Sequence, residues 1–187
     1  MIKVGLFLGS FDPFHIGHKE AIVKALKLGM DRVLVIPTPG NPWKSNKPED
    51  ISFRNMIIGL ETQDFPEVES IILLTQPRED GKYYSVDQLK KVLDISDLNN
   101  YQFYIIGGPE ITKEIKNWKS GDWILENFQV LEIPRPGYSL NNTWGTEISS
   151  TKIKELIKEG NWNEIEKYYT NSETIDLLKN SKYASKD

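Results

Sequence analysis

The two histidines of this 187-residue chain, His15 and His18, both fall within residues 9–18. Because histidines can stand almost anywhere on a protein surface, the confinement of both to one short segment indicates a functional site. An imidazole donates a hydrogen bond in its charged and in its neutral form. Two imidazoles three residues apart on a turn between a strand and a helix face the same side, so both can donate to phosphate oxygens. The spacing therefore predicts a phosphate site. A zinc site is not expected, because the chain has no cysteine and no third histidine.

The segment also stands where a fold would build an anion site. Residues 2–8 form an apolar run that predicts a strand, and residues 19–26 predict a helix. A glycine-containing turn between a strand and a helix leaves free backbone N–H groups that point at one spot. The positive end of the helix dipole adds to their attraction for an anion.

Strand-like and helix-like segments alternate along the whole chain. We expect strands at 2–8, 32–36, 68–74, 101–106 and 130–133, and helices at 19–26, 52–62, 85–93 and 149–158, with helix-like sequence after Gly160. Ser52 would cap the second helix. This alternation predicts an α/β fold of the Rossmann-like, doubly wound kind, a mostly parallel sheet of roughly five to six strands with helices on both faces. Because ligands bind beyond the carboxyl ends of such strands, the site should be lined by residues 9–18, 37–50, 75–85 and 107–120.

Composition limits the class of protein. A hydrophobic content of 39% and a charged content of 27% indicate a folded chain, expected to be one domain over 1–187 with 149–187 as a helical C-terminal subregion. The net charge of −4 argues against a nucleic-acid partner, and the apolar runs are too short to cross a membrane. A cytoplasmic location is expected, and assembly into a homo-oligomer stays open.

Two motifs at opposite ends of the chain resemble those of a known superfamily. Residues 9–18 (GSFDPFHIGH) are similar to the signature of the nucleotidyltransferases, which include the class I aminoacyl-tRNA synthetases. Residues 148–154 (ISSTKIK) resemble the ISSTxIR motif of the adenylyltransferases. Further segments resemble the bacterial nicotinate (nicotinamide) mononucleotide adenylyltransferases, namely 41–44, Arg54, 78–89, Trp118 and the RPGY sequence at 135–138. The resemblance extends from Gly5 to about Ile175.

The resemblance implies a reaction between ATP and a pyridine mononucleotide. The 5′-phosphate of the mononucleotide attacks the α-phosphorus of ATP, and pyrophosphate leaves, in a step of NAD biosynthesis. Such a transfer depends on alignment and charge stabilisation, with no covalent partner on the enzyme. His18 would then contact the α-phosphate and His15 the β/γ end. Mg²⁺ would lie between the phosphates, held mainly by phosphate oxygens and water rather than by protein ligands. Asp12 is either an outer partner of that ion or the Asx-turn residue before Pro13.

The same resemblance implies two sets of binding residues. Those expected to bind ATP are Gly9, Ser10, Phe11, His15, Gly17, His18, Gly107, Arg135, Ser149, Ser150, Thr151 and Lys154. Those expected to bind the mononucleotide are Ser10, Phe11, Lys44, Tyr84, Ser85, Trp118 and Lys119. Within these sets, the hydroxyl groups at 149–151 would hold the triphosphate tail, although a plain helix cap is the simpler interpretation. Lys44 would contact the mononucleotide phosphate, Trp118 would stack on the pyridine ring, and Ser85 and Lys119 would recognise a nicotinate carboxylate.

Several residues depart from the family pattern. Pro109 stands where the family usually has an Asp that helps to hold the ATP end of the site, so Glu110 would have to reach it. Lys119 replaces a frequent aromatic residue, and Lys154 replaces the Arg that closes ISSTxIR. These departures leave the preferred ring open, with a nicotinamide-preferring enzyme as the alternative. A transferase for another phosphorylated small molecule and a non-catalytic nucleotide sensor are more distant alternatives.

Overall fold

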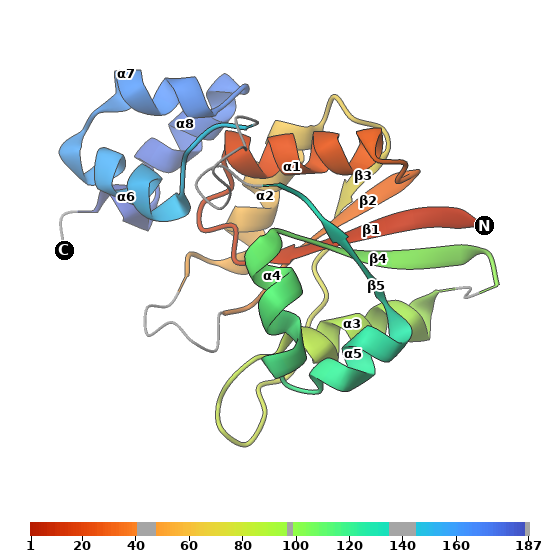
Figure 1. Ribbon diagram of the computed structural model, residues 1–187. Helices are drawn as coiled ribbons and strands as arrows, with labels where there is room; N and C mark the ends of the chain where they lie inside the picture. The colour runs from red at the N-terminus through yellow and green to blue at the C-terminus, as the bar shows by residue number, and fades with distance from the viewer. Residues whose placement is uncertain (41–47, 97–98, 135–144, 186–187) are drawn as a thin grey trace.

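The computed structural model describes residues 1–40, 48–96, 99–134 and 145–185. Its centre is a five-stranded sheet in the order β3-β2-β1-β4-β5, and every neighbouring pair of strands is parallel. The strands are β1 (Ile2–Gly9), β2 (Arg32–Pro37), β3 (Val68–Ser70), β4 (Tyr101–Gly107) and β5 (Gln129–Glu132). Figure 1 shows β1 in the middle of this sheet. The predicted fold class, Rossmann-like with a parallel sheet, is confirmed.

The strand order reverses beside β1. The chain adds β2 and β3 on one side of β1 and then crosses to place β4 and β5 on the other. Val4 of β1 pairs with Arg32 of β2 and with Phe103 of β4, so β1 is enclosed on both edges. The crevice beyond the carboxyl ends of β1 and β4 is the position at which such sheets bind ligands.

Helices cover both faces of the sheet (Figure 1). On one face, α1 (Ile16–Lys27) and α2 (Ile51–Thr62) share a core with Val33 and Val35 of β2. On the other face, α3 (Ser85–Ile95) and α5 (Gly121–Asn127) pack with Leu6 and Ile105. A further short helix, α4 (Pro109–Glu114), follows β4 directly and continues into a 3₁₀ turn, Ile115–Asn117.

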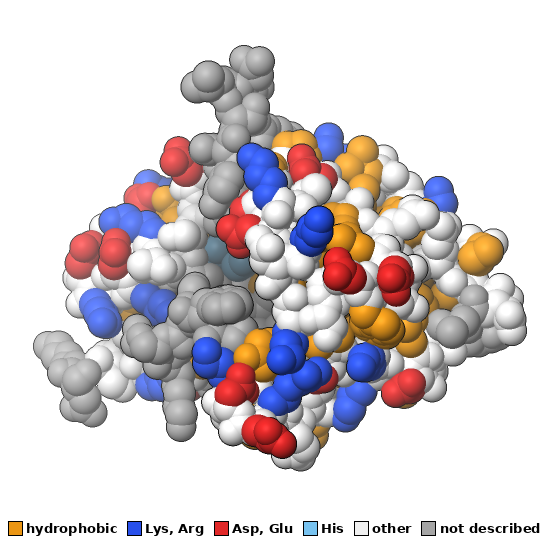
Figure 2. Space-filling model, turned by 60° about the horizontal axis from the view of Figure 1, so that its bottom comes forward, with side chains coloured by type: hydrophobic (Ala, Val, Ile, Leu, Met, Phe, Trp, Pro, Cys, Tyr) orange, Lys and Arg blue, Asp and Glu red, His pale blue; other side chains and the backbone are white. Residues whose placement is uncertain are grey.

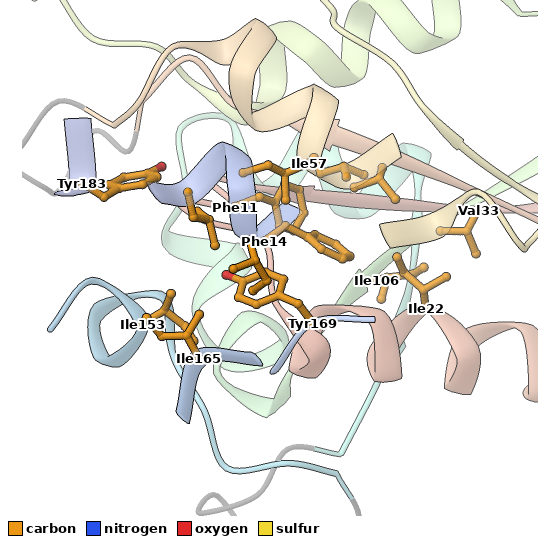
Figure 3. Packing of buried hydrophobic residues seen from close by; sticks show 14 of the residues in the cluster. Phe11, Phe14, Ile22, Val33, Ile57, Ile106, Ile153, Ile165, Tyr169 and Tyr183 are labelled. Atoms are coloured by element: carbon orange, nitrogen blue, oxygen red, sulfur yellow. The ribbon is translucent and has the colours of Figure 1, made fainter. Parts of the chain in front are cut away.

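The C-terminal helices join the first of these two cores. They are α6 (Ser150–Glu159), α7 (Trp162–Ile165) and α8 (Ser172–Lys179), with 3₁₀ turns at Glu166–Tyr168 and Lys182–Ala184. Ile153 and Ile165 belong to the same buried cluster as Phe11 and Phe14 of the histidine segment (Figure 3). The C-terminal helices therefore pack directly against the loop that carries the predicted phosphate site.

A buried carboxylate also fastens the C-terminal helices to the sheet domain. Glu61 of α2 is only 2% exposed. It accepts hydrogen bonds from the backbone N–H of Thr170 (2.9 Å) and of Asn171 (3.2 Å), and from the hydroxyl groups of Thr170 (2.9 Å) and Thr174 (2.7 Å). A buried anion is tolerated when donors satisfy it in this way.

Several expectations about the helices and strands need correction. The first helix begins at Ile16 rather than at residue 19, so the histidine segment itself forms its first turn. Asp50, not Ser52, caps α2, because its carboxylate accepts from the backbone N–H of Ser52 (2.8 Å). The strand expected at 68–74 ends at Ser70. Residues 107–120, expected as a loop, contain α4, and α5 was not expected at all.

Replacing Glu61 with Gln tests the role of the buried carboxylate. In the variant, the amide NH₂ would replace one of the carboxylate oxygens that accept hydrogen bonds from Thr170, Asn171 and Thr174. We therefore expect the free energy of unfolding to fall by about 2–3 kcal/mol. Urea denaturation followed by circular dichroism measures it. Glu67→Gln, a change at an exposed position, is the matched control. Equal midpoints for the two variants would contradict the assignment.

Candidate active site

The two histidines form one unit at the start of α1. His15 is the N-cap residue, and its backbone N–H donates to Nδ1 of His18 (3.2 Å). In return, the backbone N–H of His18 donates to the carbonyl oxygen of His15 (2.9 Å). The two rings are stacked, with centroids 3.8 Å apart and planes inclined by 27°. The contact at Nδ1 of His18 favours the tautomer that carries the ring proton on Nε2.

Aromatic side chains fix the position of His18. The ring of Phe14 stacks on it with centroids 5.3 Å apart, and the ring of Phe11 meets it edge-on at 5.1 Å. Phe11 itself has a left-handed backbone (φ 46°) and is 3% exposed. That conformation costs a residue other than glycine roughly 1–2 kcal/mol, and the packing of Phe11 in the core offsets the cost. The turn before α1 is therefore held rigid by its own side chains.

Gly17 is required by the close approach of its neighbours. A Cβ atom at this position would lie 3.2 Å from the ring of His15 and 3.2 Å from Cγ2 of Ile148. These contacts are tighter than ordinary van der Waals distances, so a side chain would push the His15 ring or the segment before α6 aside. The glycine lets two motifs from opposite ends of the chain meet.

Two adjoining pockets lie at the carboxyl ends of the strands. The histidine pocket, about 210 Å³, is lined by the histidine segment and by the ends of β1 and β4. The tyrosine pocket, about 260 Å³, is lined by the segment around Tyr84 and by residues that follow α4. Leu8, Gly9, Ser10 and Ile111 line both pockets. Figure 2 shows the histidine side chains at the floor of a hollow in the face that it displays.

The predicted site residues divide between these pockets. Of the residues expected to bind ATP, the histidine pocket is lined by Gly9, Ser10, Phe11, His15, Gly17, His18 and Gly107. Of those expected to bind the mononucleotide, the tyrosine pocket is lined by Ser10, Tyr84, Ser85, Trp118 and Lys119. Phe11, expected to touch both substrates, lines the histidine pocket alone. Lys44 and Arg135 lie outside the described residues.

Only Ile148 of the second motif lines a pocket, and the hydroxyl and lysine side chains of the motif contact the rest of the chain. Ser149 caps α6, its side-chain oxygen accepting from the backbone N–H of Lys152 (3.2 Å), and the Ser150 hydroxyl donates to the carbonyl oxygen of Pro13 (2.9 Å). Nζ of Lys154 lies 2.9 Å from Oδ2 of Asp12. Neither these residues nor Thr151 line the two pockets, although Ile148 lines the histidine pocket. Contact between this motif and ATP stays a prediction.

Asp12 bridges separate segments of the chain. Besides pairing with Lys154, its carboxylate accepts from the backbone N–H of Glu49 (2.8 Å) and from the hydroxyl of Tyr183. Although burial raises the pKa of Asp12, these hydrogen bonds outweigh it and leave the pKa below its ordinary value. Asp12 is thus an ionised anchor of the loop.

Glu110 is the acidic residue expected to act in place of the Asp that Pro109 replaces. It lines the histidine pocket, and its carboxylate lies over Gly108 so closely that a Cβ there would be 2.3 Å from Oε2. An acidic side chain therefore lines the histidine pocket, one residue later in the chain than the family pattern has it, and its contact with ATP stays a prediction.

Arg54 is the residue whose importance the sequence interpretation missed. Its side chain is buried, and its Nη1 donates to the carbonyl oxygens of Ser10 and of Thr38 (2.9 Å). Its Nε donates to the carbonyl oxygen of Glu49 (2.7 Å). Burial lowers the pKa of Arg54 from its ordinary value, and nearby acidic groups, Asp12 first, counteract that effect. One guanidinium thereby joins the loops that follow β1 and β2 to the start of α2.

A signal for Arg54 was present in the sequence. Arg54, Ile57, Ile58 and Glu61 are all buried on α2 at spacings of three and four residues. The two charged residues thus fall in register with an apolar stripe, where an ionised side chain needs dedicated partners.

Charged side chains surround Tyr84, which lines the tyrosine pocket. Arg78 forms a two-pronged bond with Asp87 (2.7 and 3.0 Å), and its guanidinium lies 5.6 Å from the centroid of the Tyr84 ring. The hydroxyl of Tyr84 donates to Asp80 (2.5 Å). Nζ of Lys119 is 6.0 Å from the same ring. The pocket thus combines aromatic surface with a cation at its wall.

The described residues contain neither a cluster of metal-binding side chains nor a membrane-spanning helix. No group of three or more His, Cys, Asp and Glu side chains among them could hold a metal ion. No helix in the described part of the chain is long and apolar enough to cross a membrane.

Known proteins share this fold. A structure of Plasmodium falciparum nicotinic acid mononucleotide adenylyltransferase, complexed with NaAD, superposes with a TM-score of 0.67 at 22% identity. The match covers 98% of this chain and 98% of that one. At this identity, the likeness establishes the fold.

Sequence comparison establishes the family. The cytidylyltransferase-like family model matches residues 6–156. A relative from Flavobacterium psychrophilum, named a probable nicotinate-nucleotide adenylyltransferase, is 30% identical over 175 residues, covering 84% of this chain and 87% of the relative. A relative of the same name from Oceanobacillus iheyensis is 27% identical over 173 residues, covering 87% of each. The chain therefore belongs to the cytidylyltransferase-like family and, within it, to the nicotinate-nucleotide adenylyltransferases.

Proposed function

We propose that this chain transfers the adenylyl group of ATP to nicotinate mononucleotide, giving deamido-NAD and pyrophosphate. The observation that carries the proposal is the pair of adjoining pockets, which share Gly9 and Ser10 at the end of β1. One pocket contains the histidine pair and the other contains the aromatic and cationic groups suited to a pyridine nucleotide. Two substrates bound in them would meet at the shared residues, where a bond between them can form.

The reaction needs alignment and charge stabilisation. An oxygen of the mononucleotide phosphate forms a bond to the α-phosphorus of ATP, and the bond from that phosphorus to the bridging oxygen of pyrophosphate breaks. Negative charge grows on the α-phosphate oxygens and on the leaving group. Nε2 of His18 would donate to the α-phosphate, and the contact of Nδ1 with the backbone of His15 supports this role. The His15 ring, stacked on it, would face the β/γ end. Donors fixed before the reaction cost no reorganisation when it occurs.

The residues present fit a magnesium ion bound chiefly by the substrate. Mg²⁺ commonly uses one or two carboxylates together with phosphate oxygens and water. Two carboxylates line the histidine pocket, and Glu20 already accepts from the backbone N–H (2.7 Å) and hydroxyl (2.8 Å) of Thr146. Glu110, the other of the two, would hold the ion from the wall of this pocket. When bound, the ion neutralises charge on the triphosphate.

Preference for the nicotinate ring would come from the tyrosine pocket. Trp118 offers a flat surface for the pyridine, and Lys119 offers a positive charge that a carboxylate recognises and a neutral carboxamide does not. Nicotinamide mononucleotide is the competing substrate. Ser85 adds a hydroxyl that can donate to either ring substituent.

Replacing His18 with Ala tests the catalytic assignment. Loss of one fixed donor to the reacting phosphate should lower kcat by about 10²–10³-fold. Pyrophosphate release, measured with ATP and each mononucleotide separately, gives the rate. Lys27→Ala, at an exposed position in the last turn of the same helix, is the control and should keep full activity. A wild-type chain that binds ATP but releases no pyrophosphate with either mononucleotide would favour a sensor instead.

Replacing Lys119 with Ala tests the ring preference. The ratio of kcat/KM for nicotinate mononucleotide to that for nicotinamide mononucleotide should fall about 5- to 10-fold, because one charge-assisted contact is lost. Lys116→Ala removes an exposed lysine that lines neither pocket and should leave the ratio unchanged. If Lys119→Ala also leaves this ratio unchanged, Lys119 does not distinguish the carboxylate of nicotinate from the carboxamide of nicotinamide.

A further inference from the structure

We propose that Tyr183, near the C-terminal end of the chain, is a positioning residue for the phosphate-binding segment, acting through Asp12. The kinetic part of this inference rests on the proposed adenylyl transfer. Its structural part rests on contacts between the 3₁₀ turn Lys182–Ala184 and the loop before α1.

Asp12 receives contacts from three segments that are distant in sequence. The hydroxyl of Tyr183 donates to Oδ1, which also accepts from the backbone N–H of Glu49 at 2.8 Å. Oδ2 pairs with Nζ of Lys154 at 2.9 Å. The side chain of Asp12 is 13% exposed, so water supplies little of its solvation. Both carboxylate oxygens therefore depend on these protein donors.

The donor is itself held firmly. Tyr183 is 6% exposed, and its ring meets that of Phe53 edge-on, with centroids 6.2 Å apart. The preceding Lys182 donates through its backbone N–H to Glu49 (3.2 Å) and through Nζ to the carbonyl oxygen of Pro48 (2.8 Å). Figure 3 shows Tyr183 at the edge of the core that contains Phe11 and Phe14. Packing of the Tyr183 ring and the two hydrogen bonds of Lys182 therefore hold the phenol in its position beside Asp12.

The phenol remains a donor at physiological pH. Burial and the hydrogen bond to Asp12 raise the pKa of Tyr183 above its ordinary value. The groups whose charges act on this phenol come from different elements: Asp12 and Glu49 favour its protonated form, and Arg54 opposes it.

If Asp12 moved, its neighbours in the chain would move with it and would displace His18. Asp12 follows Phe11, whose ring touches His18, and precedes Pro13, whose carbonyl oxygen accepts from Ser150. The tyrosine pocket, in contrast, is not lined by any residue of this network. Loss of the Tyr183 hydroxyl should therefore disturb the ATP side of the reaction and spare the mononucleotide side.

The decisive variant is Tyr183→Phe, which keeps the ring and removes the hydroxyl. We expect kcat to fall about tenfold and the Kd for ATP to rise about threefold, while the KM for the mononucleotide stays unchanged. Tyr168→Phe is the matched control, since its hydroxyl donates to Glu164 (3.0 Å), away from Asp12. The thermal midpoint of each variant shows whether stability alone has changed.

A double variant separates positioning through Asp12 from a general structural effect. If Tyr183 acts through Asp12, Tyr183→Phe should add little to the defect of Asp12→Asn, because contacting residues in one network are not additive. Additive effects, or a Tyr183→Phe chain with wild-type kcat and wild-type ATP affinity, would overturn the inference. Should the wild type show no turnover, the proposed function fails, and the ATP Kd of Tyr183→Phe still decides the role of Tyr183.

Discussion

The site depends on one buried guanidinium. Arg54 donates to the carbonyl oxygens of Ser10, Thr38 and Glu49, which lie in the loops that follow β1 and β2. Ser10 lines both pockets and Thr38 lines the tyrosine pocket. An arginine suits this task because its planar fork presents several donors in fixed directions. The relative position of the two binding regions is thus set by backbone contacts to a single side chain.

Much of the fold was predictable because apolar periodicity is a strong signal. The runs at 32–36 and 101–106 gave β2 and β4 nearly to the residue. The short helices α4 and α5 were missed because six or seven residues carry little periodic pattern. The predicted start of α1 is too late, since Gly17 and the histidines have weak helix propensity. The first turn is stabilised by two hydrogen bonds between His15 and His18, one of them to the His18 side chain.

The sequence predicted which residues line the candidate site better than it predicted how those residues contact one another. The motif around His15 and the residues Tyr84 and Trp118 were assigned to two substrates, and they line two different pockets. The pairing of Lys154 with Asp12 could not be foreseen, because a helix-start motif gives no information on which loop lies beside it. The structural roles of Arg54 and Glu61 do not follow from resemblance or periodicity, because their partners are backbone groups of distant loops.

The contacts of Glu61 have a consequence for how the chain folds. Its partners Thr170 and Thr174 lie 109 and 113 residues further along the chain. Lys154 and Asp12 are separated by 142 residues. Contacts of such long range close late, because the entropy of a large loop must be lost before they form. The histidine turn therefore takes its final shape only when the last helices dock. Partly folded chains whose C-terminal helices are undocked would lack the finished histidine turn even where their strands are paired.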